Sequence, residues 1–138
     1  MKLTKLLINA SILIALLILM SCGGSGSGSN SPGDVTKTAI ENLANENYDD
    51  VVKVYITKKG EELTDEEQAK IMAFMPTAKA EIDKNDGLKE VQIIEETIAE
   101  DGKSATVKSK MIYNNGKEGR TDSTRLIKVN ENWRIRIN

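Results

Sequence analysis

The chain has 138 residues with 19 Lys and Arg, 21 Asp and Glu and a formal net charge of −2, and this length suits a single domain. The slightly acidic balance argues against a nucleic-acid-binding protein, which needs a strongly basic surface. The chain contains no histidine. This excludes histidine acid-base catalysis, Ser-His and Cys-His nucleophile pairs, and imidazole metal sites.

Residues 1–21 have the pattern of a secretory signal peptide. Lys2 and Lys5 form a basic start, and residues 6–20 are apolar apart from one Asn and one Ser. An apolar stretch this short is typical of a signal peptide, because a membrane-spanning helix needs about 20 apolar residues. The segment ends in Leu-Met-Ser-Cys, with the small residue Ser21 before the predicted cleavage point.

Cys22 is the only cysteine of the chain and the predicted site of lipid attachment. Its thiol is the nucleophile that takes a diacylglycerol, and cleavage between Ser21 and Cys22 makes it the first residue of the mature protein. The alternative is an uncleaved helical anchor in which the cysteine is incidental. A single cysteine excludes an intramolecular disulfide, and acylation removes a free thiol from an oxidising compartment.

Residues 22–33 read CGGSGSGSNSPG, a composition typical of a flexible tether. The folded domain is expected to span residues 34–138. Gly23 does not look like the aspartate that retains lipoproteins of enteric bacteria in the inner membrane. The expected location is therefore the cell envelope, on the outer membrane where the cell has one and otherwise on the outer face of the plasma membrane.

The first half of the domain has the apolar periodicity of helices. Three are predicted, over residues 34–45, over residues 48–56, and from residue 64 to the Asp-Gly pair at 86–87. Asp34 is the expected N-cap of the first. Thr64 and Glu67 match a capping box at the start of the third, and Pro76 is expected to kink or split that helix.

From residue 88 onward the apolar residues alternate, which indicates strands. Asp101-Gly102 and Asn115-Gly116 are hairpin turn sequences, and a further turn is expected near residues 130–132. Four antiparallel strands are therefore predicted, joined in sequence as a meander: residues 88–100, 103–114, 117–129 and 132–138.

Two-residue turns fix the registers of these strands. They pair Glu95 with Lys108, Thr97 with Thr106, Val107 with Thr124, Ala105 with Leu126, and Leu126 with Ile135. The inner face of the sheet then collects most of the apolar residues: Ile94, Ile98, Ala105, Val107, Met111, Leu126, Trp133, Ile135 and Ile137. The remaining apolar residues are expected to leave apolar surface on the outer face: Val91, Ile93, Ile112 and Ile127.

Helices followed by an antiparallel sheet define an α+β domain, here three helices on one face of a curved four-stranded meander. The lipobox, the Gly/Ser tether, the helical sequence TAIENLANENYDDVVKVYI and the closing KVNENWRIRI resemble small bacterial lipoproteins with a nuclear-transport-factor-2-like (cystatin-like) domain. The resemblance implies a curved sheet wrapped around helices, often with a cone-shaped pocket. It implies a fold and not an activity.

Polar residues on the predicted inner face define a candidate pocket: Glu96, Ser109, Tyr113, Arg120 and Asp122. A buried charge is costly unless it is paired. The group is therefore a small polar ligand site at the open end of the cone, or a pair in which Arg120 neutralises Asp122 or Glu96, or a set turned outward by a bulge. Either carboxylate could serve as a lone general base, but no second acid or oxyanion donor accompanies it, and no catalytic residue is predicted.

Charge is divided unevenly along the domain. Residues 34–102 carry 8 basic and 18 acidic residues, a net charge of −10, whereas residues 103–138 carry 9 and 3, a net charge of +6. A basic stripe is predicted on the outer face of the sheet: Lys108, Lys110, Arg125, Arg134 and Arg136. The stripe is either a docking surface for an anionic partner or a solvated face partly paired with Glu95 and Glu90.

The sequence thus predicts a lipoprotein of the bacterial cell envelope, held at the membrane by a lipid anchor, that acts as a non-catalytic binding or interaction module. Its expected partner is an envelope protein or a second copy of the chain. The alternative is a pocket enzyme of the isomerase or dehydratase type. No cofactor, nucleic acid or metal ion is expected, since acidic runs such as Glu61-Glu62 lack the spacing and turn glycine of a calcium loop.

Overall fold

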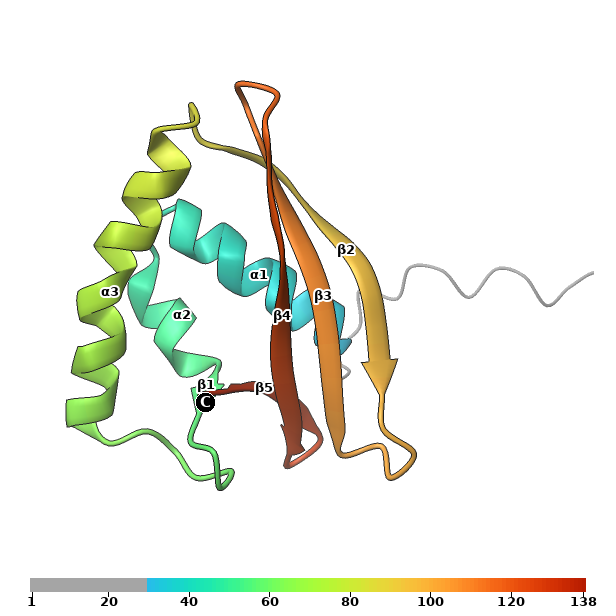
Figure 1. The fold of residues 1–138 in the computed structure, drawn as a ribbon. Helices are drawn as coiled ribbons and strands as arrows, with labels where there is room; N and C mark the ends of the chain where they lie inside the picture. Colours follow the sequence, from blue (N-terminus) through green and yellow to red (C-terminus); the bar gives the residue numbers. More distant parts are fainter. Residues whose placement is uncertain (1–29) are drawn as a thin grey trace, which may run out of the picture.

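The computed structural model describes residues 30–138; the predicted signal peptide, Ser21, Cys22 and most of the predicted tether lie outside the described residues. The helices are α1 (Pro32–Ala44), α2 (Tyr48–Lys53) and α3 (Asp65–Asp83). The strands are β1 (Tyr55–Ile56), β2 (Leu88–Ile98), β3 (Ser104–Tyr113), β4 (Glu118–Val129) and β5 (Asn132–Arg136). The helices lie on one side of a curved sheet (Figure 1). None of the helices in this part of the chain is long and apolar enough to cross a membrane.

The sheet has five strands in the order β1-β5-β4-β3-β2. Strands β2 to β5 form the predicted antiparallel meander, but β1 pairs in parallel with β5. The prediction of four strands and of a helix over residues 48–56 is therefore wrong at this point. The free edge of β5 offers backbone donors, and Ile135 N–H and Ile137 N–H donate to the carbonyls of Val54 (2.7 Å) and Ile56 (3.0 Å). These bonds favour an extended chain at Tyr55–Ile56 over a further helical turn.

The predicted strand registers are confirmed. All five pairs occur: Glu95–Lys108, Thr97–Thr106, Val107–Thr124, Ala105–Leu126 and Leu126–Ile135. Next to the Asn115-Gly116 turn the ladder is one residue out of the predicted register, because Ile112 pairs with Glu118, and a β-bulge restores the predicted register in the central part of the sheet.

The first part of β2 departs from its predicted register because of a β-bulge. The register shifts between Ile93 and Glu95, so that Ile93 pairs with Ser109 and Val91 with Met111. Val91 is consequently on the inner face and only 3% exposed. Ile94, predicted to be in the core, is 52% exposed. The assignment of Val91 and Ile93 to the outer face was wrong for this reason.

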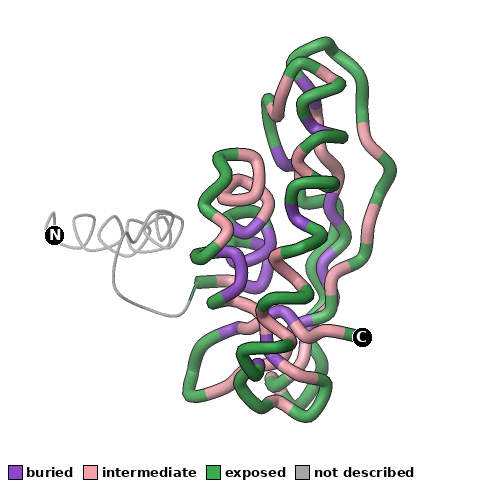
Figure 2. The backbone as a smooth tube through the Cα atoms, turned by 90° about the vertical axis from the view of Figure 1, so that its left-hand side faces the viewer, coloured by how far each residue is buried: buried purple, intermediate pink, exposed green. Residues whose placement is uncertain are grey.

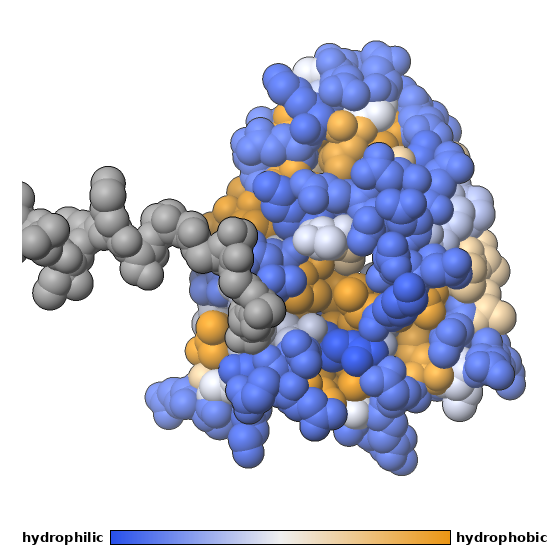
Figure 3. All heavy atoms as spheres, turned by 180° about the vertical axis from the view of Figure 1, so that it is seen from behind, coloured by the Kyte–Doolittle hydropathy of each residue, from blue (hydrophilic) through white to orange (hydrophobic). Residues whose placement is uncertain are grey.

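Apolar side chains also reach the surface of the domain. The exposed large ones are Phe74, Ile93, Ile94 and Ile98, whereas Ile112 and Ile127 are half-buried. Seen from behind, the domain shows apolar areas enclosed by hydrophilic side chains (Figure 3). Apolar surface is therefore present, as the sequence predicts, but the exposed residues of the sheet are those near the bulge of β2 and at the end of that strand.

Helix α1 starts earlier than predicted. Ser31 is its N-cap, and Asp34 is the third helical residue, whose carboxylate accepts the Ser31 N–H in a capping box. The predicted capping box of α3 at Thr64 and Glu67 is confirmed. Pro76 does not split α3, which runs without interruption from Asp65 to Asp83. Pro76 is exposed, so water can bond the backbone carbonyl that loses its helical partner.

The core lies between the helices and the inner face of the sheet. One cluster joins α1 to the strands and contains Val35, Ala39, Val107, Leu126 and Trp133 among others. A second joins α2 to α3 through Val51, Val52, Leu63 and Met75. Figure 2 shows buried segments of the helices and strands facing one another, with exposed loops at the ends of the domain. The predicted burial of Trp133 is confirmed, since it is 7% exposed.

Candidate functional site

A cavity of about 550 Å³ lies between α3 and the β3–β4 hairpin. Tyr113, Arg120 and Asp122 line it together with Glu81 and Met111. The structure thus brings together three of the five residues predicted to form a pocket. The other two do not line it: Ser109 is the strand partner of Asp122, and Glu96 lies on β2.

Arg120 was expected on the core face, and it lies beside a β-bulge on the side of β4 that lines the cavity with Met111 and Asp122. Lys110 pairs with Thr121 and Ile112 pairs with Glu118. The single residue between the first members of these pairs therefore faces two residues of β4, Gly119 and Arg120. The Arg120 side chain is 88% exposed and its Nε lies 2.7 Å from a carboxylate oxygen of Asp122. One of the alternatives left open by the sequence therefore holds, because Arg120 neutralises Asp122 at the exposed rim of the cavity.

Tyr113 is the buried polar residue of this cavity, at 6% exposure. Burial raises the pKa of its phenol, and the negative charges of Glu81 and Asp122 raise the pKa further. Gly119 leaves room for the ring: a Cβ at Gly119 would lie 3.2 Å from the Tyr113 hydroxyl oxygen. The phenol therefore stays neutral and offers one donor and one acceptor at the cavity wall.

Glu96 acts at the start of α1 and not in the pocket. Its carboxylate accepts the Gly33 N–H at 2.7 Å, where the positive end of a helix dipole favours a negative charge. Ser109 is 3% exposed and pairs with Ile93 and Asp122 in the middle of the sheet. The carboxylates of Glu96 and Asp122 thus have different partners, the Gly33 N–H and the Arg120 guanidinium.

The residues of the predicted basic stripe share the outer face of the sheet, and most of them are paired. Lys108 forms an ion pair with Glu95, as one of the alternatives had predicted, and Lys110 pairs with Glu118 at 2.6 Å. Arg134 pairs with Glu62 at 2.9 Å. Exposed pairs of this kind contribute little to stability, but they reduce the charge available for a partner.

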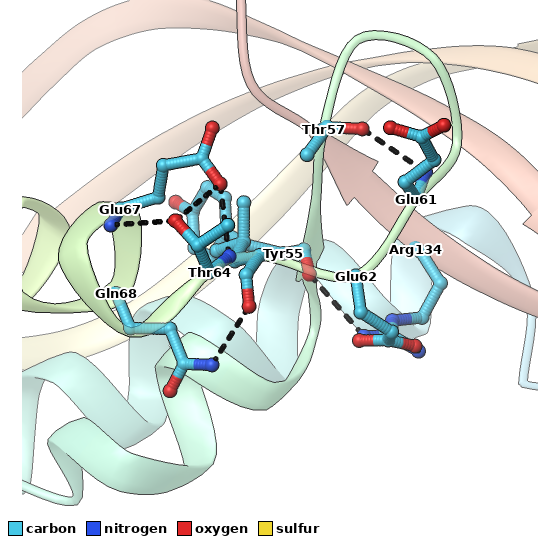
Figure 4. A network of polar contacts seen from close by, with 9 residues as sticks. Tyr55, Thr57, Glu61, Glu62, Thr64, Glu67, Gln68 and Arg134 are labelled. Carbon is cyan, nitrogen blue, oxygen red and sulfur yellow. Dashed lines mark hydrogen bonds and ion pairs between the residues drawn. The ribbon is translucent and has the colours of Figure 1, made fainter.

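Arg134 is held by the loop that joins β1 to α3 (Figure 4). Its guanidinium donates to both carboxylate oxygens of Glu62, at 3.0 and 2.9 Å, and to the carbonyl of Tyr55 at 3.2 Å. The loop also lies beside Ile127, since a Cβ at Gly60 would be 3.3 Å from the Ile127 Cδ1. In the sequence, Glu61-Glu62 can be identified only as an acidic run. The pairing of Glu62 with Arg134 joins distant parts of the chain and leaves no local pattern.

Acid should loosen this loop, because the Glu62–Arg134 pair depends on an ionised carboxylate. Hydrogen bonds from Arg134, and then its charge, hold the pKa of Glu62 below its ordinary value. The contribution of the pair is therefore complete above the ordinary pKa of glutamate, and it is lost as the pH falls through the lower pKa of the folded state. An NMR pH titration of the Glu62 carboxyl carbon measures this pKa.

Arg134→Gln should return the pKa of Glu62 to its ordinary value, because both the hydrogen bonds and the charge are removed. Arg120→Gln removes the same charge from another part of the sheet and should leave Glu62 unchanged. Equal pKa values for Glu62 in the wild type and in Arg134→Gln would contradict the pairing.

Arg125 and Arg136 differ from the rest of the stripe, because neither forms an ion pair among residues 30–138. They line two cavities, of about 660 and 250 Å³. Lys58, from the loop after β1, lines the larger one. The same part of the chain holds no group of three or more acidic, His or Cys side chains arranged for a metal ion.

Comparison with known proteins identifies the fold. A solved structure of a Campylobacter jejuni protein, named as a candidate NTF2-like transpeptidase, is similar over 79% of this chain and 100% of its own, with 23% identity and a TM-score of 0.66. The structure of Aln2 from a Streptomyces species matches over 78% of this chain and 88% of its own, with 13% identity and a TM-score of 0.40. No curated protein matches the chain.

A family profile matches most of the sequence. The profile described as a domain of unknown function, DUF4878, matches residues 25–136. Together with the fold likeness to the Campylobacter protein, this match agrees with the resemblance derived from the sequence as far as the domain is concerned. The chain belongs to the DUF4878 family and has an α+β fold of the NTF2-like type, with a five-stranded mixed sheet.

Proposed function

We propose that the chain is a lipoprotein of the bacterial cell envelope, anchored through Cys22, whose domain is a non-catalytic binding module. Its interaction surface is the outer face of the sheet. The observation that carries the proposal is that two neighbouring arginines of this face, Arg125 and Arg136, lack an acidic partner in the described part of the chain. Like charges placed together are unfavourable, so a surface that keeps them suits an anionic partner.

Binding is preferred to catalysis because the inner cavity offers no free acid-base pair. Asp122 is paired with Arg120, and Glu96 accepts the Gly33 N–H at the start of α1. Tyr113 faces the cavity with a phenol whose pKa is raised by burial, so it is a poor proton acceptor at neutral pH. Nothing in this arrangement favours the isomerase or dehydratase alternative.

The sequence Leu-Met-Ser-Cys and the apolar segment before it support the anchor. Cys22→Ala should abolish metabolic labelling with radioactive palmitate, because the acyl acceptor is lost. Ser25→Ala, a change of similar size in the adjoining Gly/Ser segment, should leave labelling at the wild-type level. Persistent labelling of Cys22→Ala, or a mature N-terminus at another residue, would show that the anchor is not at Cys22.

The outer face is tested by reversing its two unpaired arginines in the full-length protein. Cross-linked adducts in intact cells, with an envelope protein or with a second copy, should be lost in Arg125→Glu/Arg136→Glu. Adducts of the wild type should weaken with added salt in isolated envelopes, because screening acts over about 8 Å at physiological ionic strength.

Lys70→Glu/Lys84→Glu is the matched control for this experiment. It makes the same charge change on α3 and at its C-cap, where Lys70 pairs with Glu66 and Lys84 pairs with Glu81. The control should keep the wild-type adducts. If the arginine variant also keeps them, with the same oligomeric state, the outer face is only a solvated surface.

A further inference from the structure

Arg125 and Arg136 lie side by side at the end of the β4–β5 ladder. The last pair of this ladder is Leu126 with Ile135, and Arg125 and Arg136 are the next residues of the two strands. Both arginines line the same two cavities. Positive side chains directly opposite each other on neighbouring strands repel. The arrangement therefore needs an anion, or another compensating group, to offset the repulsion.

No aspartate or glutamate of the described residues pairs with Arg125 or Arg136. Five other cations of β3, β4 and β5 have acidic partners: Lys108, Lys110, Arg120, Lys128 and Arg134. The Nε atoms of Arg134 and Arg136 are both buried without a hydrogen-bond partner, but only Arg134 has an acidic partner for the rest of its guanidinium.

The space around the two arginines suits an anion. The larger cavity, of about 660 Å³, adds the Lys58 ammonium and the hydroxyls of Ser123 and Thr124. The smaller, of about 250 Å³, adds the hydroxyls of Thr97 and Thr106. No aspartate or glutamate is among the described residues that line either cavity. Every charged side chain there is thus positive, and the Ser and Thr side chains add hydroxyl donors; the last residue of the sequence, Asn138, also lines the larger cavity.

We infer that Arg125, Arg136 and Lys58 form a binding site for one phosphate group. Two guanidinium forks and an ammonium supply more donors than the two oxygens of a carboxylate can accept. A phosphate monoester offers three acceptor oxygens and a charge of about −1.5 to −2 at neutral pH, and arginine forks bind phosphate with two parallel hydrogen bonds. The inference rests on the proposed function, because it names the ligand class of the proposed interaction surface.

Two sources could present this chemistry, a soluble phosphate monoester and the monoester headgroup of phosphatidic acid. Cys22 and Asn30 are eight positions apart in the sequence, so the chain holds the start of the domain within about 28 Å of a lipidated Cys22. A headgroup is therefore within reach of an anchored domain. The site chemistry is the same for both sources, and the experiment has one arm for each.

In the first arm, full-length protein in phosphate-free maltoside micelles is titrated with inorganic phosphate while NMR follows the arginine Nε–H signals. We expect saturable shifts of the Arg125 and Arg136 signals, and no saturable shift with acetate at equal ionic strength. Arg125→Gln and Arg136→Gln should each weaken phosphate binding about tenfold or more, the loss expected for a charge-assisted hydrogen bond. Arg120→Gln removes the same charge at the exposed Arg120–Asp122 pair and should bind phosphate like the wild type.

In the second arm, the anchored protein is placed in phosphatidylcholine nanodiscs with or without phosphatidic acid. Shifts of the same two signals only with phosphatidic acid identify a headgroup as the source, whereas shifts with inorganic phosphate and in neither nanodisc identify a soluble compound. Both results support the site. Absence of a response in both arms, or an equal response to acetate, overturns it.

The melting temperatures of the two arginine variants show whether Arg125 and Arg136 bind a ligand or stabilise the fold. Without phosphate, Arg125→Gln and Arg136→Gln should melt at the wild-type Tm or above it, because one of two facing positive charges is removed. If either variant fails to fold, Lys58→Gln, a change in an exposed loop side chain, takes its place, and an unchanged phosphate affinity in that variant overturns the proposal. The first arm does not depend on acylation of Cys22 or on cross-linking, so its failure is distinguishable from a failure of the proposed function.

Discussion

Replacing Trp133 with alanine should lower the free energy of unfolding by about 3–5 kcal/mol, the usual cost of emptying a large aromatic site in a core. Trp133 is 7% exposed and packs with Val35 and Ala39 of α1 and with Leu126 of the neighbouring strand. Its ring also lies 5.7 Å from the Lys128 ammonium, a distance at which a cation–π contact contributes. Domains of this size have about 5–15 kcal/mol in total, so the variant is expected to be close to unfolding at room temperature.

Chemical denaturation followed by circular dichroism measures this change. Phe74 provides the matched control, because it is an aromatic residue on α3 that is 75% exposed. Phe74→Ala should change the free energy of unfolding by no more than about 0.5 kcal/mol. Since Trp133 is the only tryptophan, its fluorescence gives a second measurement. An emission typical of solvent-exposed indole, or equal midpoints for Trp133→Ala and the wild type, would contradict its place in the core.

The central part of the sheet could be predicted because its signals are local. Asp101-Gly102 and Asn115-Gly116 fix two hairpins, and the registers that follow put Val107, Leu126 and Ile135 on one face, as the structure confirms. The bulges at Ile94 and near Gly119 could not be predicted in the same way. A bulge depends on how the strand meets its neighbours and the helices, and the alternation of apolar residues is equally strong on either side of it.

The candidate site was predictable only in part, for a related reason. The side chains that lie within one hairpin, Tyr113, Arg120 and Asp122, do line one cavity. Glu96 instead contacts Gly33, 63 positions away, and Arg134 contacts Glu62, 72 positions away. Contacts over such separations depend on the completed fold, and single-sequence periodicity carries no information on them. The sequence indicates which residues of the outer face are basic, but only the structure shows which of them form ion pairs.

The end of α2 is the largest difference between prediction and structure. Val51 and Val52 are buried by α2, as the helical period requires, and the same period continues through Tyr55. The helix nevertheless ends before Tyr55. Tyr55 and Ile56 pair with β5 and form a two-residue strand. A strand this short has no alternation of its own to detect. It is identified only through the partner that supplies its hydrogen bonds.

Ile56→Ala should therefore lower the free energy of unfolding by about 2–5 kcal/mol, although the sequence gives this residue no place in the sheet. Ile56 is 0% exposed, and its neighbour Tyr55 packs against both core clusters. Loss of the side chain leaves a cavity where β1, β5 and the following loop meet. The matched control is Ile98→Ala, which removes the same atoms from a residue that is 48% exposed and should cost clearly less.

Hydrogen exchange decides whether β1 itself is present. In a four-stranded meander, β5 would be an edge strand, and the amides of Ile135 and Ile137 would be open to solvent on that side. In the five-stranded sheet they donate to Val54 and Ile56, so both should exchange slowly in the wild type. In Ile56→Ala, the exchange of Ile137 should accelerate more than that of core amides in β3, because β1 is at the edge of the sheet and can open without the rest. Fast exchange of both amides in the wild type would show that the chain after α2 is not paired with β5.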